Sequence, residues 1–429
     1  MKFQLTATMT AALPVIKQLE EHGYEAVFVG GAVRDMLLGL PINDIDIASS
    51  ALPEQTMQIF PHTIPTGLQH GTVTVIDKGI PYEITTYREE SQYEAHRKPK
   101  QVSFISDLDN DLLRRDFTMN AMAIRANGEL HDPYGGHEDM MSSIVRCVGY
   151  ADLRFLEDAL RMLRAVRFMG AYHYKPALST WRSLKRHRSL LVHIAMERVH
   201  AELDKMIKSE KPHRALGWLA ASGLLLFCKE SLVLPYELQQ SMMDVQKNTF
   251  NNEALYFLQE IEQLDLRWAS LFVFFNWEEK DALATMAALR LSGDRTKTIH
   301  TIMKIHTIVR TNINEQNMLM KRWREVVLTY SESMASKWLL IAHAMKHGTV
   351  SISENVLDLL KTEMEKMPVK SMKQLKINGS HLQRQLGREG GPWLSMMLKR
   401  LLESAAAGEV CNETDKLAAL AKLWNEEGN

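Results

Sequence analysis

The sequence has few cysteines, glycines and prolines, and this scarcity excludes several classes of protein. Only three cysteines, Cys147, Cys228 and Cys411, occur among 429 residues, and their wide spacing and odd number exclude a disulfide framework and a CxxC metal site. We therefore expect a reducing, cytoplasmic setting. The 22 glycines and 13 prolines fall below the combined share of about 12% in average proteins, so turns should be sparse and long helices common.

Long apolar runs and an excess of charge of one sign are also lacking. No segment approaches the roughly 18 apolar residues of a membrane helix, and the N-terminus carries no export signal, so we expect no membrane contact. The formal net charge of -1 gives no general attraction to phosphate, so contact with nucleic acid would need local basic patches. The sequence indicates no protein partner.

Two parts of the chain differ in their pattern. Before residue 150, short apolar or alternating runs are separated by Gly, Pro, Asn and Asp, which predicts strands joined by turns. From Asp152 onward, apolar residues recur at helical spacing. We expect an α+β protein, in which a mixed sheet with helices precedes a part that is entirely helical. The expected strands are Ala26–Val29, Ile45–Ala48, Thr72–Ile76, Tyr82–Thr86 and Ala121–Ile124, and the first expected helices are Leu13–Glu21 and Val33–Leu38.

Two adjacent glycines, Gly30 and Gly31, follow the first expected strand and precede a helix. Glycine lets the backbone approach a ligand closely, and the free N–H groups at the start of the helix, together with Arg34, favour a triphosphate. The same pattern also occurs where the chain only makes a tight turn. The motif alone leaves both interpretations open.

Asp44 and Asp46 follow the two glycines within a short apolar segment. Residues two apart in a strand share a face, so the two carboxylates should project together. Neighbouring carboxylates repel each other unless cations bind, and carboxylate oxygens are ligands that Mg²⁺ prefers, so we expect one or two Mg²⁺ ions. The order of the motifs favours nucleotidyl transfer over a solvated surface pair. Glu83 is the candidate for a third catalytic carboxylate, or else it pairs with Arg88 or a lysine.

The segment Leu113–Ala123 contains Arg114, Arg115, Asp116 and Asn120. Guanidinium groups suit phosphate, and Asp116 or Asn120 can accept a hydrogen bond from a ribose hydroxyl. An ion-pair cluster at the surface is the alternative. The segment follows Asp44 and Asp46 within about 75 residues, and this order favours a role in binding sugar and phosphate.

The segment Phe155–Arg167 is expected to form one helix, with Asp158 and Arg161 on one face. A surface salt bridge is the simple interpretation. Alternatively, an Asp acceptor beside an Arg donor complements cytosine and adenine, which present an amino donor next to a ring acceptor. Uracil and guanine present the reversed pattern, and each unpaired group would cost about 1 to 3 kcal/mol.

In this order the motifs resemble those of class II tRNA nucleotidyltransferases, the CCA-adding enzymes of bacteria and eukaryotes. The resemblance implies a polymerase-beta-like nucleotidyltransferase head at residues 1–150 and a helical neck with a nucleotide-base template at 151–210. A helical body at 211–310 and a helical tail that binds tRNA at 311–429 would follow. The motifs that carry the resemblance are Gly30–Asp35 with Asp44 and Asp46, Arg114–Ala121, His131–Gly136, Glu157–Arg161 and Glu197–Leu203.

The resemblance also implies roles for single residues. Asp44 and Asp46 would bind Mg²⁺, and Asp158 with Arg161 would act as a protein template that pairs with CTP or ATP. His131–Gly136 would be a hinge. Together, the motifs and the resemblance assign nucleotide binding to Gly30, Gly31, Arg34, Arg115, Asp116, Asn120, Asp158, Arg161 and Arg164.

Two further segments of the chain also resemble the family. Glu89–Lys100, with Tyr93, His96 and Arg97, corresponds to a flexible loop needed for the switch from C to A addition. The tail resembles the family more loosely. Its basic residues are candidates for contact with the tRNA backbone, although each alone also fits a solvated helix face: Lys321, Arg322, Arg324, Lys373 and Lys376.

The implied function is template-independent addition of CCA to the 3′ end of tRNA from CTP and ATP, with release of pyrophosphate. Three alternatives stay open: an A-adding tRNA nucleotidyltransferase, a bacterial poly(A) polymerase and a catalytically silent RNA-binding protein. The weak overall charge favours the tRNA enzyme over the poly(A) polymerase. The three carboxylates argue against the silent protein.

Overall fold

The computed structural model describes residues 1–94, 98–243, 252–345 and 352–427. The chain divides into two compact units, one formed by Met1–Leu232 with Tyr236–Asn252 and the other by Val233–Pro235 with Glu253–Asn429. No helix in the described ranges is long and apolar enough to cross a membrane. The expected fourfold division into head, neck, body and tail is finer than these two units and stays a prediction.

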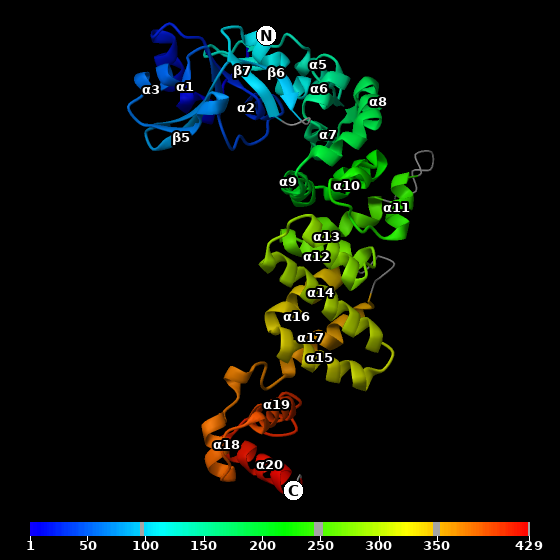
Figure 1. Ribbon diagram of the computed structural model, residues 1–429. Coiled ribbons are helices and arrows are strands. Elements are labelled where there is room, and N and C mark those ends of the chain that lie inside the picture. Colours follow the sequence, from blue (N-terminus) through cyan, green and yellow to red (C-terminus); the bar gives the residue numbers. More distant parts are fainter. Residues whose placement is uncertain (95–97, 244–251, 346–351, 428–429) are drawn as a thin grey trace. The chain divides into compact units, whose positions relative to one another are not determined.

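A seven-stranded mixed sheet, coloured blue to cyan in Figure 1, forms the scaffold of the first unit, with the strand order β3-β4-β5-β2-β1-β8-β9. β2 and β5 run parallel, and the other neighbouring pairs run antiparallel. The strands are β1 (Ala26–Val29), β2 (Asp46–Ser49), β3 (Thr63–Gly67), β4 (Thr72–Asp77), β5 (Ile80–Thr86), β8 (Ala123–Ile124) and β9 (Leu130–His131).

The expected strands are present, with shifted ends. β1 has the expected bounds, whereas β2 begins one residue later than expected, at Asp46, which pairs with Val29, the last residue of β1. The last expected strand shortens to Ala123–Ile124, and Ala121, its expected first residue, is instead the C-cap of a 3₁₀ helix, η2 (Thr118–Asn120). β1 is buried along its whole length and packs in the core with Tyr87.

Helices surround this sheet and continue after it. α1 (Ala7–Glu21) begins six residues before the expected start, because the Thr6 hydroxyl caps it by accepting from the N–H of Met9 at 3.3 Å. The next helices are α2 (Gly31–Leu37), α3 (Pro53–Ile59), η1 (Leu68–His70), α4 (Leu108–Leu113) and α5 (Gly136–Met141). The following helices of the unit are α6 (Ala151–Glu157), α7 (Leu160–Tyr172), α8 (Leu178–His187), η3 (Arg188–His193), α9 (Met196–Lys208), α10 (Pro212–Ser222), η4 (Leu224–Phe227) and α11 (Tyr236–Met243).

The expectation of one helix over Phe155–Arg167 is wrong. α6 ends at Glu157 and α7 starts at Leu160, because Asp158 adopts an extended conformation with φ -138° and ψ 105°. Its carboxylate accepts a hydrogen bond from the N–H of Leu160 at 3.0 Å, which competes with continuation of the helix. The break turns Asp158 from a helix-face residue into a corner between two helices.

Two small sheets complete the first unit. β6 (Arg88–Glu94) and β7 (Lys98–Phe104) form an antiparallel hairpin in the segment expected to be a flexible loop. Tyr93 pairs with Pro99 in this hairpin, whereas His96 and Arg97 lie outside the described residues. β10 (Ile144–Val145) pairs in parallel with β11 (Lys175–Pro176).

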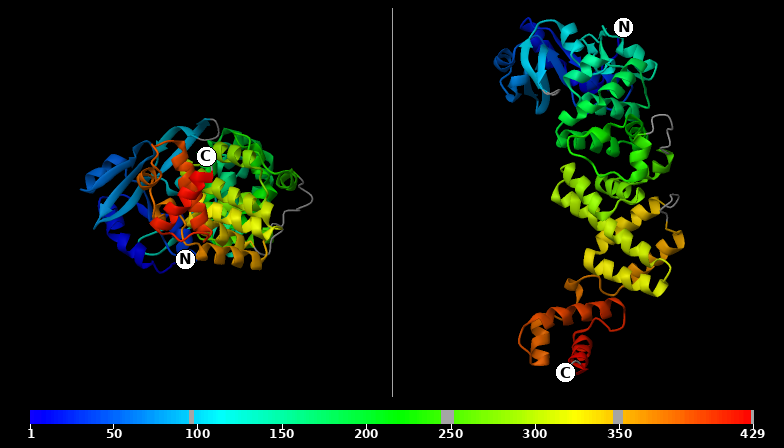
Figure 2. Two further views of the ribbon diagram at one scale, coloured as in Figure 1. Left: turned by 90° about the horizontal axis from the view of Figure 1, so that it is seen from below. Right: turned by 45° about the vertical axis from the view of Figure 1, so that its right-hand side comes forward.

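The second unit is built from helices in both views of Figure 2, where it runs from green through yellow to red. This confirms the expected helical character of the later chain, apart from the two-residue strand β11 in the first unit. Its elements are η5 (Asn252–Glu260), α12 (Leu264–Phe274), α13 (Glu279–Ala288), α14 (Gly293–Asn312), α15 (Gln316–Tyr330), α16 (Glu332–Ala344), α17 (Glu354–Lys366), η6 (Met372–Gln374), α18 (Gly379–Leu386), α19 (Pro392–Ala406) and α20 (Thr414–Glu427).

Candidate active site

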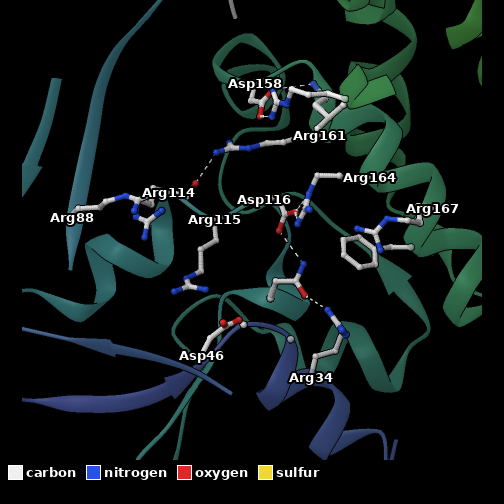
Figure 3. Close-up of a pocket in the computed structure, with 16 residues that line it drawn as sticks. Arg34, Asp46, Arg88, Arg114, Arg115, Asp116, Asp158, Arg161, Arg164 and Arg167 are labelled. Carbon is white, nitrogen blue, oxygen red and sulfur yellow. Dashed lines mark hydrogen bonds and ion pairs between the residues drawn. The ribbon is translucent and has the colours of Figure 1, made fainter. Parts of the chain in front are cut away.

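A pocket of about 540 Å³ lies in the first unit, between the Gly30 turn and the helices α7 and α9 (Figure 3). This volume is within the range of small-molecule sites, about 300 to 1,000 Å³. Eight arginines and three aspartates line the pocket, so its walls carry a positive excess that suits a polyanion such as a triphosphate. All nine residues expected to bind a nucleotide line it, together with Asp46.

The Gly30 turn brings the backbone against the charged side chains. Gly30 has φ +67° and ψ -132°, a conformation that glycine adopts readily and other residues rarely do. A Cβ at this position would lie 3.3 Å from Oδ2 of Asp46 and 3.4 Å from Nη1 of Arg115. The glycine therefore leaves room for a carboxylate and a guanidinium beside the start of α2.

The three predicted carboxylates do not form one cluster. Asp46 is half-buried at the start of β2, and Glu83 is its in-register neighbour on parallel β5, where it is exposed. Asp44 is exposed ahead of the strand, so the two aspartates do not share a strand face as expected. Within the described part of the chain, no group of three or more His, Cys, Asp or Glu side chains is placed to hold a metal ion.

The charges of Asp44 and of two arginines nevertheless act on the carboxylate of Asp46. Burial raises the pKa of Asp46, and the charge of Asp44 raises it further, against the lowering effect of Arg115 and Arg34. A cation at this position would relieve the repulsion between the two aspartates. The donor set of hard carboxylate oxygens fits a divalent cation such as Mg²⁺.

Asp116 connects the two halves of the pocket. Its Oδ1 accepts from Nδ2 of Asn120 at 3.0 Å, and its Oδ2 accepts from Nε of Arg164 at 2.7 Å (Figure 3). Asn120 in turn accepts from Nη1 of Arg34 at 2.7 Å. Burial alone would raise the pKa of Asp116, but the charge of Arg164, helped by the Asn120 hydrogen bond and Arg161, lowers it to about 2. Asp116 is therefore a fixed negative charge among arginines.

Arg114 and Arg115 are held from behind by a buried carboxylate that the motif analysis did not single out. Asp111 is completely buried and accepts from Nη2 of Arg114 at 2.7 Å and from Nη2 of Arg115 at 3.1 Å. It also accepts from the backbone N–H of Arg88 at 3.2 Å. Both arginines therefore keep defined positions in the pocket wall. The side chain of Arg115 points toward Asp46 (Figure 3).

The two residues expected to read the base have described contacts with other partners. Asp158 forms an ion pair with Arg198 of α9, with Nη2 to Oδ2 at 2.8 Å. Arg161 bonds Glu157 through Nη1 at 2.7 Å and the carbonyl of Arg114 through Nη2 at 2.9 Å. The described ion pairs of Asp158 and Arg161 are thus made with Arg198 and Glu157, and both side chains line the same pocket.

Several pocket residues were missed by the sequence reasoning. Arg88, Leu160, Arg167, Phe168 and Arg198 line the pocket but had no predicted role there. Arginines recur every three residues on α7 through positions 161, 164 and 167, and this spacing could have identified the third.

In the second unit, the structure neutralises part of the predicted tRNA-binding set. Arg322 pairs with Glu325 at 2.7 Å, and Arg324 pairs with Glu363 at 2.5 Å. The remaining predicted residues, Lys321, Lys373 and Lys376, are exposed to solvent.

Comparison with known proteins shows the family. The CCA-adding enzyme of Geobacillus sp. (strain WCH70) is 36% identical to this chain over 409 residues, which covers 95% of each protein. The chain belongs to the family of CCA-adding enzymes. The CCA-adding enzyme of Ligilactobacillus salivarius (strain UCC118) is 34% identical over 416 residues and covers 97% of this chain and 96% of its own.

Structural comparison agrees over the whole length. The crystal structure of the Bacillus stearothermophilus CCA-adding enzyme in complex with CTP has a TM-score of 0.83 and 32% identity, and the match covers 98% of both chains. This confirms the resemblance and the expected fold class. Family models match residues 26–146 as "Poly A polymerase head domain", 174–232 as "Probable RNA and SrmB- binding site of polymerase A" and 259–421 as "tRNA nucleotidyltransferase domain 2".

Proposed function

We propose that this chain adds CCA to the 3′ end of tRNA from CTP and ATP, without a nucleic-acid template. The observation that carries the proposal is the pocket, in which Asp46 and the Gly30 turn share one cavity with Asp158 and Arg161. In the reaction, the 3′-hydroxyl oxygen of tRNA forms a bond to the α-phosphorus of the nucleotide, and the bond to the pyrophosphate breaks. Family membership supports this function, because relatives of nearly the same length are CCA-adding enzymes.

Catalysis is assigned to Asp44, Asp46 and Glu83. Asp44 and Asp46 would hold Mg²⁺, two ions in all, and Glu83 stands next to Asp46 in the sheet as the third carboxylate. The raised pKa of Asp46, caused by burial and by Asp44, supports a site built to receive positive charge. When bound, the metal would supply activation of the attacking hydroxyl and neutralisation of the triphosphate.

The arginine-rich walls bind the nucleotide. Arg34 and Arg115 flank the glycine turn and suit the phosphates, because forked guanidinium donors match phosphate oxygens. Asp116 and Asn120, which lie between them and Arg164, are the groups assigned to the ribose.

Base choice is assigned to Asp158 and Arg161. Oδ1 of Asp158 accepts from the N–H of Leu160 at 3.0 Å and from Nη1 of Arg198 at 3.4 Å. Oδ2 has one described bond, from Nη2 of Arg198 at 2.8 Å, and retains a second lone pair for an amino group of cytosine or adenine. Arg161 is oriented by Glu157 and can present a donor to the ring nitrogen of the same base. Arg198 fixes the template carboxylate without being part of the template itself.

The domains, the flexible segment and the tRNA contacts are also assigned as expected for a CCA-adding enzyme. We assign residues 1–150 to the catalytic head, 151–210 to the neck, 211–310 to the body and 311–429 to the tail. The segment with Tyr93, His96 and Arg97 would serve the switch from C to A addition, and the exposed Lys321, Lys373 and Lys376 support tRNA contact by the tail. The three free cysteines support a reducing, cytoplasmic setting.

The proposal is tested with three tRNA transcripts that end before CCA, after C and after CC. Each is incubated with Mg²⁺ and with CTP, ATP or both, and the products are resolved on a gel. Extension of all three to CCA, with no further growth, is the expected result. Addition only to the CC-ended transcript would mean an A-adding enzyme, a long A tail would mean a poly(A) polymerase, and no extension would favour the RNA-binding protein.

A further inference from the structure

One aromatic ring stands among the arginines of the pocket. Phe168 of α7 lines the cavity and is only 3% exposed. Three guanidinium carbons surround its ring, with Arg167 at 4.1 Å, Arg34 at 5.4 Å and Arg164 at 5.5 Å from the ring centroid. All three distances are within about 6 Å, the range of cation–π attraction.

Each of these arginines also meets a carboxylate from a different part of the first unit. The three carboxylates lie on α2, in the loop before η2 and on α9. The pairs are Arg34 with Asp35 at 2.9 Å, Arg164 with Asp116 through Nε and Oδ2 at 2.7 Å, and Arg167 with Glu202 through Nε and Oε2 at 2.6 Å. One ring therefore contacts three guanidinium groups whose ion pairs come from three separate elements.

The ring is itself fixed by its neighbours. Phe117 meets it edge-on, with centroids 5.7 Å apart and planes at 83°, and Tyr172 stacks on it at 6.0 Å and 23°. The hydroxyl of Tyr172 donates to Oδ1 of Asp35 at 3.1 Å, and so contacts the carboxylate that also holds Arg34. The position of Phe168 is therefore coupled to the start of α2 as well as to α7.

Three guanidinium groups around one point repel one another, and a polyanion needs them in a fixed arrangement before it arrives. The negative face of an aromatic ring attracts all three without consuming their hydrogen-bond donors. In the described structure Arg167 donates to Glu202 through Nε alone, so its terminal nitrogens keep their donors for phosphate oxygens.

We propose that Phe168 is a positioning residue for the triphosphate, which holds Arg34, Arg164 and Arg167 in one phosphate-binding arrangement. This rests on the proposed function, since it takes the pocket to be the site of CTP and ATP. It adds Arg167 to the phosphate-binding groups and gives the ring a role that does not depend on the base. Phe168 itself touches neither the reacting atoms nor the base edge.

The test compares Phe168→Leu, which keeps an apolar side chain but removes the aromatic face, with Phe168→Tyr, which keeps it. Phe168→Leu should raise KM for CTP and for ATP in parallel, by about five- to thirtyfold, while kcat changes less than about twofold. Phe168→Tyr should restore KM to within about threefold of wild type. Inhibition by cytidine, which has no phosphate, should be nearly unchanged in both variants.

A matched control separates positioning from stability. Phe272 of α12 is 1% exposed and packs against Trp268 and Trp277, so Phe272→Leu removes an equally buried ring in the second unit. It should lower the thermal midpoint without changing KM for the nucleotides. Direct CTP binding by calorimetry gives the same comparison without turnover.

An unchanged KM in Phe168→Leu would overturn the role of Phe168, and so would an equal loss of affinity for CTP and for cytidine. A KM of Phe168→Tyr as high as that of Phe168→Leu would overturn it as well. Failure of the proposed function is distinguishable, because the wild-type protein would then not extend the transcripts to CCA, whatever KM Phe168→Leu shows.

Discussion

Asp46 shows how a single side chain joins the sheet to the pocket. It is the first residue of β2, and its position is set by pairing with Val29 of β1 and Glu83 of β5. Gly30 leaves space for its carboxylate, and Arg115 stands on the other side of that space. A carboxylate held in this way has defined geometry toward a cation and a triphosphate.

The first prediction concerns this carboxylate. Asp46→Asn should lower kcat at least about a thousandfold, because the amide keeps the shape but loses the charge that would hold Mg²⁺. Unfolding and tRNA binding should stay close to wild type, as measured by thermal melting and filter binding. Asp77→Asn at the end of β4 is the matched control and should stay active. Loss of tRNA binding by Asp46→Asn equal to its loss of turnover would contradict the assignment.

The sequence motifs predicted which residues line much of this pocket, but they could not predict which side chains form ion pairs with one another. The glycine pair, Arg115 and Asp116 line one pocket, as the motifs suggested. The pairing of Asp158 was different, because the three-residue spacing to Arg161 matters only in a continuous helix, and the chain breaks at Asp158. Its true partner, Arg198, lies 40 residues away, and only the tertiary fold brings the two together.

At the scale of elements, the closeness of α7 and α10 depends on Gly170. A Cβ at Gly170 would lie 2.4 Å from Cα and 2.5 Å from Cβ of Ala215, so the two helices touch with no room for a side chain. α7 also carries Arg161, Arg164 and Phe168 of the pocket wall. Displacement of α7 would therefore disturb the site as well as the packing.

Gly170→Ala should consequently lower the free energy of unfolding of the first unit by about 1 to 3 kcal/mol, in spite of the better helix propensity of alanine. Denaturant unfolding measures this loss. Gly293→Ala at the start of α14, where nothing lies within 4 Å of the added Cβ, is the matched control and should be nearly neutral. Equal stability of the two variants would show that α7 and α10 separate easily.

A buried histidine, His306, lies on α14. His306 is 9% exposed and packs against Trp338, with ring centroids 6.3 Å apart. Burial lowers the pKa of His306 to about 4, and the charge of Arg310 acts in the same direction. Because the unfolded chain binds this proton near its ordinary value of 6.5, the neutral folded form is favoured above pH 6.5 and loses that advantage as pH falls toward 4.

The unfolding free energy of the second unit should therefore fall by roughly 2 to 3 kcal/mol between pH 6.5 and pH 4 through this group alone. His306→Gln, which does not titrate there, should show a smaller decrease over the same interval in denaturant melts. If His306→Gln keeps the wild-type slope, the titrating group is another one.

Elements with strong apolar patterns were predictable, and polar or very short ones were not. β1 has four buried residues and was predicted with its observed bounds. The hairpin of β6 and β7 lies in the segment that the family resemblance implied to be a flexible loop. Arg88–Glu94 is polar and lacks the alternation that indicates a strand. Two-residue strands such as β10 exist only through pairing with a distant segment, which the local sequence does not encode.

At the scale of the whole molecule, composition and periodicity predicted an α+β part followed by helices, and the structure and its full-length relatives confirm this order. The net charge of -1 coexists with a local concentration of positive charge, since eight arginines line one pocket. Charge that is balanced over the chain is concentrated where the triphosphate is proposed to bind.

The central claim is that one pocket carries out both nucleotidyl transfer and base selection. The most direct measurement is sequencing of the 3′ ends made by the wild type, Asp158→Ala and Asp46→Asn from a tRNA that lacks CCA, with Mg²⁺ and all four nucleoside triphosphates. The wild type should add CCA, Asp158→Ala should still extend but incorporate U or G, and Asp46→Asn should add nothing. Unaltered CCA ends from Asp158→Ala would contradict base selection by this pocket, and undiminished extension by Asp46→Asn would contradict its role in transfer.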